Sequence, residues 1–200
     1  MEIVTGVLLG LSTLLFVGPV FFYLIESTLF YGKKAGIVVA IGIILGDIIY
    51  VILIMKGFSS FFNDVTFQKW FAILGGILLL TLGLSYIFKP KKNDPSQWNL
   101  NNKDFLSIGI KAFLLNFANP FVALVWVGFL TYNQSKFNSQ IAISISLTAT
   151  LFIILLTDIL KVFLASGIKK TMSPIKFKKI QKVIGGLLIL FALRVLYVAI

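Results

Sequence analysis

Six apolar runs, most of them about twenty residues or longer, leave this chain few ways to fold. Hydrophobic residues make up 58% of its 200 residues, and only 12% are charged. A run of about twenty apolar residues is long enough to cross the hydrocarbon core of a bilayer as a helix. We therefore predict an all-α membrane protein with six transmembrane helices, near Ile3–Phe30, Gly36–Met55, Trp70–Phe88, Phe105–Leu130, Ile141–Leu164 and Ile180–Ala199.

Two of these runs contain a proline at a point where a continuous helix would be disrupted. Gly18-Pro19 lies within Phe16–Phe22 of the first run, and Asn119-Pro120 lies within Leu115–Phe121 of the fourth. Proline inside a helix removes a backbone hydrogen bond and clashes with the preceding turn. In lipid, the freed carbonyls must be satisfied by protein or by a water-filled cavity. We therefore predict broken first helices in each half, and such matching breaks indicate a transporter binding site.

The lysines are concentrated on one side of the predicted spans. The segments after the first, third and fifth spans hold Lys33, Lys34, Lys89, Lys91, Lys92, Lys103, Lys169, Lys170, Lys176, Lys178 and Lys179. The loops on the other side hold only Lys56, Lys69 and Lys136. Because positive residues gather on the cytoplasmic side, both termini are expected outside. This topology and anionic lipid headgroups account for the net charge of +11, so we expect no nucleic-acid partner.

Cysteine and histidine are both absent from the chain. Their absence excludes disulfides, thiol-based electron relays, histidine proton shuttles and most soft-metal sites. The sequence also has no phosphate-binding glycine loop and no serine nucleophile elbow. We therefore predict neither an enzyme nor an ATP-driven pump, and neither a cofactor nor a metal site. The acidic start Met1–Ile3 lacks the basic region of a signal peptide, so we expect the first span to be retained.

The polar segment 89–104 divides the chain into halves that we interpret as repeats. We predict a three-helix repeat at residues 1–88, a cytoplasmic linker at 89–104 and a second three-helix repeat at 105–200. The recurring features, in the same order, are Pro19 and Pro120, Asp47 and Asp158, and Gly75-Gly76 and Gly185-Gly186. Three spans per half place the halves in opposite orientations, which predicts an inverted repeat. The alternative is that glycine-leucine strings recur by chance in apolar sequence.

Three carboxylates lie inside the predicted spans, where an ionisable side chain is costly and a functional role is the default expectation. Asp47 is preceded by glycines whose spacing lets another helix approach closely, and we favour proton coupling for it over a structural hydrogen bond. Glu26 is either a second proton-coupling residue or a glutamate near the membrane interface. Asp158 is a third candidate, although Lys161 follows it at helical spacing and can neutralise it.

Two amides flank the second proline. Asn116 and Asn119 lie three residues apart on one helical face. Amides can contact a zwitterionic substrate without the cost of burying a charge, or they can satisfy the helix break itself. Both interpretations stay open from the sequence. The predicted substrate site consists of Gly18, Pro19, Asn116, Asn119 and Pro120.

These motifs resemble a known family, the LysE-type amino-acid exporters (LysE/RhtB translocators). The N-terminal signature is matched by Gly18-Pro19, Gly32-Lys33-Lys34-Ala35-Gly36, Gly42 and Gly46-Asp47. The segment Asn116–Pro120 is similar to the asparagine-proline motif of that family. The resemblance implies a secondary exporter of amino acids or related small metabolites in the bacterial inner (plasma) membrane, driven by the proton-motive force.

The chain departs from the family pattern at two positions. Val20 follows the glycine-proline pair, where the family often has an acidic residue, and Phe121 follows Asn119-Pro120, where it often has lysine. The resemblance therefore does not imply lysine or another basic substrate.

We expect a proton antiporter that works by alternating access, with a small-molecule substrate, membrane lipid around it, and glycine spacings that would permit a homodimer. A related six-span electron carrier would need paired cysteines, which the chain lacks. The remaining alternative is a non-transporting membrane scaffold or accessory subunit. A transporter should show a polar cavity near Pro19, Asn119 and Asp47, whereas a scaffold should show a filled centre.

Overall fold

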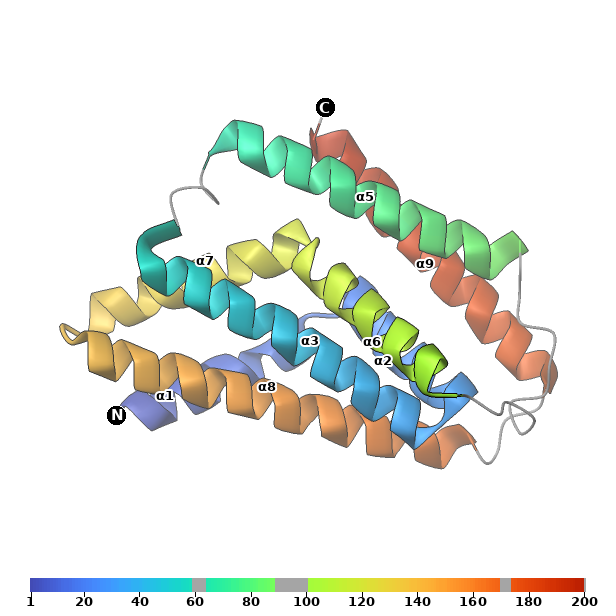
Figure 1. The fold of residues 1–200 in the computed structure, drawn as a ribbon, viewed down its shortest axis with the longest axis horizontal. Coiled ribbons are helices and arrows are strands. Elements are labelled where there is room, and N and C mark those ends of the chain that lie inside the picture. Colours follow the sequence, from blue (N-terminus) through green and yellow to red (C-terminus); the bar gives the residue numbers. More distant parts are fainter. Residues whose placement is uncertain (59–63, 89–100, 170–173, 200) are drawn as a thin grey trace.

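The computed structural model describes residues 1–58, 64–88, 101–169 and 174–199, and these residues form helices without strands (Figure 1). The elements are α1 (Glu2–Ser12), η1 (Thr13–Leu15), α2 (Pro19–Tyr31), α3 (Lys33–Leu53), η2 (Ile54–Phe58), α5 (Val65–Phe88), α6 (Asn102–Phe117), α7 (Pro120–Lys136), α8 (Gln140–Lys169) and α9 (Pro174–Ala199). Most of the predicted linker 89–104, with Lys89, Lys91 and Lys92, lies outside the described residues, as does Lys170.

The predicted spans are confirmed as apolar helices. Among the described residues, 4 helices are long and apolar enough to cross a membrane, and the number rises to 6 if each of two bent pairs counts as one span. The pair α1–α2 is bent by 77° and the pair α6–α7 by 62°. These bends lie at the two points where the sequence predicted broken helices.

Each proline begins a new helix instead of interrupting a continuous one. Pro19 and Pro120 occupy the first turn of α2 and α7, where the missing backbone N–H has no intrahelical partner to lose. Gly18 precedes α2 in an extended conformation, and Asn119 precedes α7, with its side-chain oxygen accepting from Phe121 N at 3.0 Å. The sequence therefore placed the breaks correctly, and the structure shows that they are complete.

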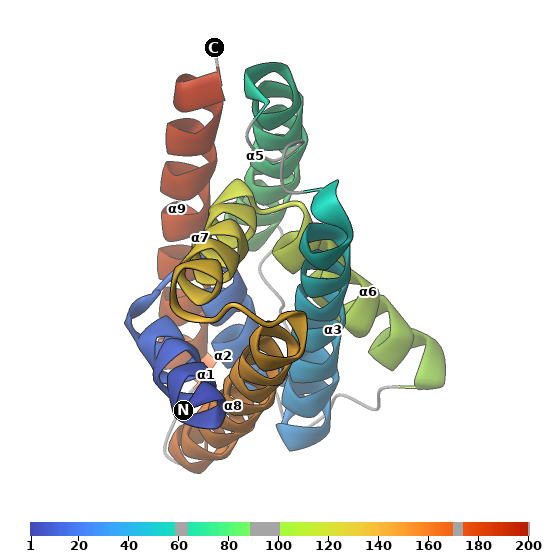
Figure 2. The same cartoon turned by 90° about the vertical axis from the view of Figure 1, so that its left-hand side faces the viewer.

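The helices pack mainly as three pairs, α1 with α8, α3 with α6, and α5 with α9 (Figures 1 and 2). Small residues permit these close contacts. A Cβ on Gly42 of α3 would lie 2.5 Å from the Gly109 carbonyl oxygen of α6, and a Cβ on Gly76 of α5 would lie 2.6 Å from Leu196 of α9. These glycines serve contacts within the chain, so the predicted homodimer gains no support from them and stays a prediction.

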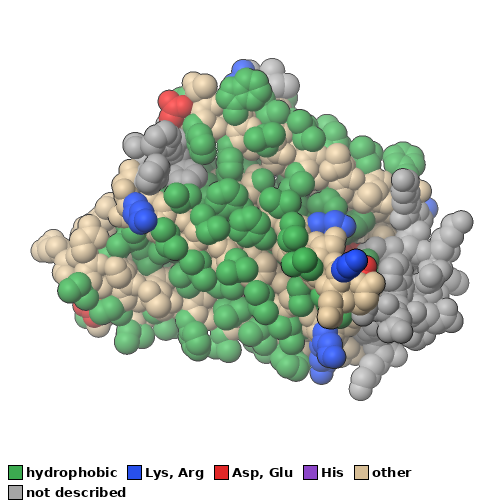
Figure 3. Space-filling view, in the orientation of Figure 1, with side chains coloured by type: hydrophobic (Ala, Val, Ile, Leu, Met, Phe, Trp, Pro, Cys, Tyr) green, Lys and Arg blue, Asp and Glu red, His purple; other side chains and the backbone are tan. Residues whose placement is uncertain are grey.

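The outer surface is suited to lipid. Figure 3 shows hydrophobic side chains over most of one face. On α3, the exposed residues Ile41, Leu45, Ile48 and Ile52 recur every three or four positions, which is the spacing of one helical stripe. The opposite stripe of the same helix, including Val39, Ile43 and Tyr50, is buried in the protein. The helix therefore separates a lipid-facing side from the protein interior.

Candidate functional site

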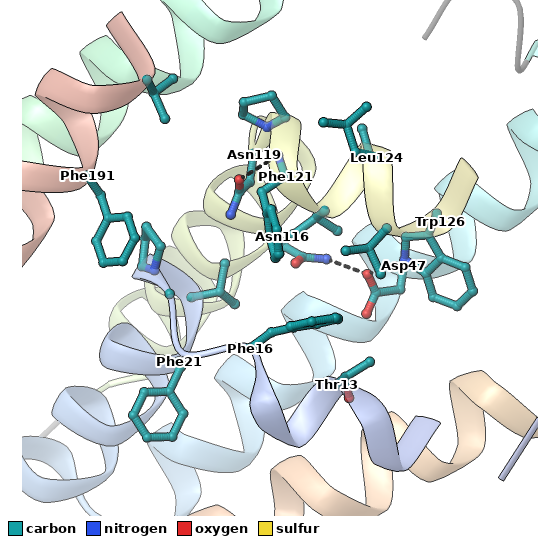
Figure 4. A pocket seen from close by; sticks show the side chains of 18 of the residues that line it. Thr13, Phe16, Phe21, Asp47, Asn116, Asn119, Phe121, Leu124, Trp126 and Phe191 are labelled. Atoms are coloured by element: carbon teal, nitrogen blue, oxygen red, sulfur yellow. Dashed lines mark hydrogen bonds between the residues drawn. The ribbon is translucent and has the colours of Figure 1, made fainter. Parts of the chain in front are cut away.

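Both helix breaks open onto one central cavity of about 930 Å³. Gly18 and Pro19 line it from the first break, and Asn119 and Pro120 line it from the second. Figure 4 shows Phe16 and Phe121 between the two breaks, and their ring centroids are 5.3 Å apart in an edge-to-face contact. The cavity thus brings together all five predicted substrate-site residues, because Asn116 lines it as well.

Asp47 of α3 reaches the cavity and is fixed by two donors from the second half of the chain. Its Oδ1 accepts hydrogen bonds of 2.9 Å from Asn116 Nδ2 and from Trp126 Nε1 (Figure 4). The Asp47 side chain is buried, and Trp126 is 1% exposed. Gly46 permits this contact, since a Cβ there would lie 2.9 Å from Asn116 Nδ2. The carboxylate is therefore held in one orientation beside the cavity.

The two asparagines have different roles in this arrangement. Asn116 donates to Asp47 and, at 2.9 Å, to the Ile43 carbonyl of α3, so it connects α6 to α3. Asn119 caps α7, and its side chain lies at the cavity wall (Figure 4). A freed carbonyl near this break is satisfied by Tyr50, whose hydroxyl donates to Phe117 O at 2.5 Å. Asn119 thus both caps the helix after the break and lines the cavity.

Asp158 also lines the cavity, and it is paired. Lys161 Nζ lies 2.8 Å from Asp158 Oδ1, three residues further along α8. The Lys161 ammonium also lies 6.0 Å from the centroid of the Phe21 ring, on α2. The neutralising interaction that the sequence suggested for Asp158 is confirmed, and the pair contributes no net charge to the cavity.

Glu26 lies elsewhere, outside the residues that line the cavity. It is fully buried, and Tyr86 of α5 donates its hydroxyl to Glu26 Oε2 at 2.9 Å. Ser27 and Gln181 are fully buried as well. This burial does not fit a solvated glutamate at the membrane interface, and it identifies a polar contact between α2 and α5.

The sequence did not identify three side chains of the cavity as site residues. Trp126 holds Asp47, Lys161 pairs with Asp158, and Arg194 adds a positive charge to the lining. The sequence could have indicated Lys161 and Arg194, because an ionisable side chain within an apolar span is costly. For Trp126, a tryptophan inside a span has no such signal, and only the packing of α7 against α3 reveals its partner.

The fold and the cavity define a polytopic all-α membrane protein with two broken helices around a central site. The sequence matches the family described as LysE type translocator over residues 11–199, and the chain belongs to that family. It is therefore a membrane translocator of the class that exports amino acids or related compounds, as the sequence motifs implied. No solved structure matches the chain.

Proposed function

We propose that the protein is a proton-coupled antiporter that exports small zwitterionic metabolites, amino acids or close relatives, across the bacterial inner membrane. Alternating access would expose the central cavity to the cytoplasm and then to the outside. The observation that carries the proposal is the meeting of both broken helices and Asp47 at one cavity.

The packing of the helices supports an inverted repeat. If α1, α2, α3 and α5 correspond to α6, α7, α8 and α9, the contact of α1 with α8 corresponds to the contact of α6 with α3, and both occur. The contacts of α3 with α8 and of α5 with α9 each relate an element to its own counterpart. Such reciprocal pairing is expected of two halves related by a pseudo-twofold axis. Rocking of one half against the other would then move the cavity between the two sides.

The substrate site that we propose consists of Gly18, Pro19, Asn116, Asn119 and Pro120. The beginnings of α2 and α7 both line the cavity, and the N-terminal end of a helix has a partial positive charge. Gly18 adds accessible backbone, because a Cβ at this position would meet nothing within 4 Å. Amide and backbone groups of this kind can orient a zwitterion while aromatic rings enclose its apolar part.

Asp47 is the proposed proton-coupling residue. It is a buried carboxylate at the cavity wall, and its two donors come from α6 and α7, the broken helix of the opposite half. A change in its protonation would alter both contacts, which links the proton to the position of that helix. Asp158 and Glu26 remain secondary candidates, since Lys161 neutralises the first and the second contacts Tyr86 outside the cavity.

The competing proposal is a scaffold or accessory subunit without transport activity. A filled centre would favour it, whereas the observed centre holds a cavity with polar groups at Asp47, Asn116 and Asn119. In the deciding experiment, proteoliposomes containing the purified protein are loaded with each proteinogenic amino acid in turn. Efflux is then measured under an imposed proton gradient. Efflux of at least one amino acid above empty liposomes is expected. Leakage equal to that of empty liposomes throughout the panel would instead support the scaffold.

A further inference from the structure

The chain contains one arginine, Arg194, and it lies on the cavity side of α9. Phe191, Arg194 and Val195 are spaced as one helical face, and all three line the cavity. Figure 4 shows Phe191 directed into this space. Arg194 therefore belongs to the cavity lining, on an element that contributes none of the predicted site residues.

Arg194 also lies deep along the membrane-spanning pair α5 and α9. Two residues after it, Leu196 packs where a Cβ on Gly76 would lie, and Gly76 is halfway along α5 (Val65–Phe88). An arginine that only anchored its helix at the lipid headgroups would lie level with the end of the neighbouring helix, here α5. Lys69 of α5 also lines the cavity, and it lies about 13 Å nearer the N-terminal end of α5 than the level of Arg194, given the rise of a helix.

The charges of the lining leave Arg194 available to a ligand. Asp158 and Lys161 neutralise one another at 2.8 Å. Asp47 is held by Asn116 and Trp126. Arg194 is exposed at the cavity lining, and within the part of the chain that the structure describes no hydrogen bond or ion pair involves it. A charged side chain within a membrane-spanning segment is costly in contact with lipid, and it marks a substrate or ion pathway where it faces a cavity.

We propose that Arg194 is the carboxylate-recognition residue of the cavity and that the substrate is a zwitterion whose carboxylate binds its guanidinium. The planar guanidinium can donate two parallel hydrogen bonds to a carboxylate, a geometry that an ammonium group does not offer. The inference rests on the proposed transport function and specifies how the exported molecule is oriented.

The test combines substitutions of Arg194 with removal of the carboxylate charge from the substrate. The probes are the amino acid that the wild-type protein exports fastest in the vesicle panel and its carboxamide, which keeps the ammonium and side chain but lacks the carboxylate charge. Equilibrium binding of both is measured on purified full-length protein for the wild type, Arg194→Gln and Arg194→Lys. Lys111→Gln is the matched control, because Lys111 is an exposed cation of α6 outside the cavity lining.

Arg194→Gln is expected to weaken binding of the amino acid about tenfold or more, as for the loss of a hydrogen-bonded charge pair, and to change carboxamide binding by less than about twofold. Arg194→Lys should recover part of the loss, and Lys111→Gln should resemble the wild type. Unchanged amino-acid binding in Arg194→Gln would overturn the proposal. Equal weakening of both probes would also overturn it, because Arg194 would then act on the structure of the cavity.

Two further results keep the inference testable. If Arg194→Gln does not fold, the wild type alone decides, since it must bind the carboxamide about tenfold more weakly than the amino acid. Equal affinity for the two would refute the role of Arg194. A wild type that exports no amino acid would refute the proposed function together with this inference. Export that persists with an insensitive Arg194→Gln variant would refute only the inference.

Discussion

Replacing Asp47 by asparagine removes one charge and leaves an oxygen that can accept the same hydrogen bonds. Asn116 Nδ2 and Trp126 Nε1 both donate to Oδ1 at 2.9 Å, and an amide oxygen has lone pairs for two donors. A neutral acceptor weakens each bond by roughly 1 kcal/mol, and removing a buried charge offsets that loss. We therefore expect the Asp47→Asn protein to fold.

The transport consequence is larger. One proton that enters for each exported zwitterion moves one charge, and a potential of 100 mV makes that movement worth about 2.3 kcal/mol. At 1.4 kcal/mol for each factor of ten, the potential can sustain an outward concentration ratio of about 50-fold. An asparagine cannot hold the transported proton, so Asp47→Asn should reduce this ratio to about one. Exchange of labelled substrate without a net gradient should continue.

The assay measures the steady-state substrate ratio across proteoliposomes held at a potential of about 100 mV. Asp64→Asn is the matched control, because Asp64 is an exposed carboxylate outside the cavity lining that accepts a hydrogen bond from Phe67 N at 2.7 Å. The control should accumulate substrate as the wild type does. If Asp47→Asn still builds the full potential-driven ratio, the coupling role of Asp47 is wrong.

Three further substitutions test the packing around the site. Gly75→Ala should lower the free energy of unfolding by about 1–3 kcal/mol, measured by thermal unfolding in detergent, because its Cβ would collide with a carbonyl oxygen at the break between α6 and α7. Gly18→Ala should leave the unfolding midpoint nearly unchanged while slowing efflux, since its methyl group enters open space at the cavity wall; unchanged efflux would argue against substrate contact at Gly18. Tyr86→Phe should lower the free energy of unfolding by about 1–3 kcal/mol, because it removes the donor to buried Glu26. Tyr197→Phe is the control, and it should have almost no effect because that side chain is 84% exposed. Equal effects of the two tyrosine variants would contradict the Glu26 contact.

Local chemistry explains why much of the fold could be predicted. The length of each apolar run fixes a membrane-spanning helix, because every backbone polar group in lipid must be satisfied within the segment. Pro19 and Pro120 fix the breaks, since neither has a backbone N–H to donate. The pair of Asp158 and Lys161 is also local, because its members lie three positions apart along one helix.

The candidate site was predictable in part. Asp47 could be singled out because a carboxylate in an apolar span is costly, yet its donors could not be named. Asn116 and Trp126 come from elements 69 and 79 residues further along the chain. Glu26 carried the same kind of sequence signal as Asp47, but it faces Tyr86 and not the cavity.

The sequence by itself determined that the chain is a helical membrane protein, where its two helices break and which carboxylates are unusual. Those properties depend on the composition of a run and on the chemistry of single residues. Only the tertiary structure decided that both breaks and Asp47 meet at one cavity, that Glu26 does not, and that Arg194 of the last helix lines it. The reason is physical, because these contacts depend on how the faces of distant helices pack, and that packing has no local counterpart in the sequence.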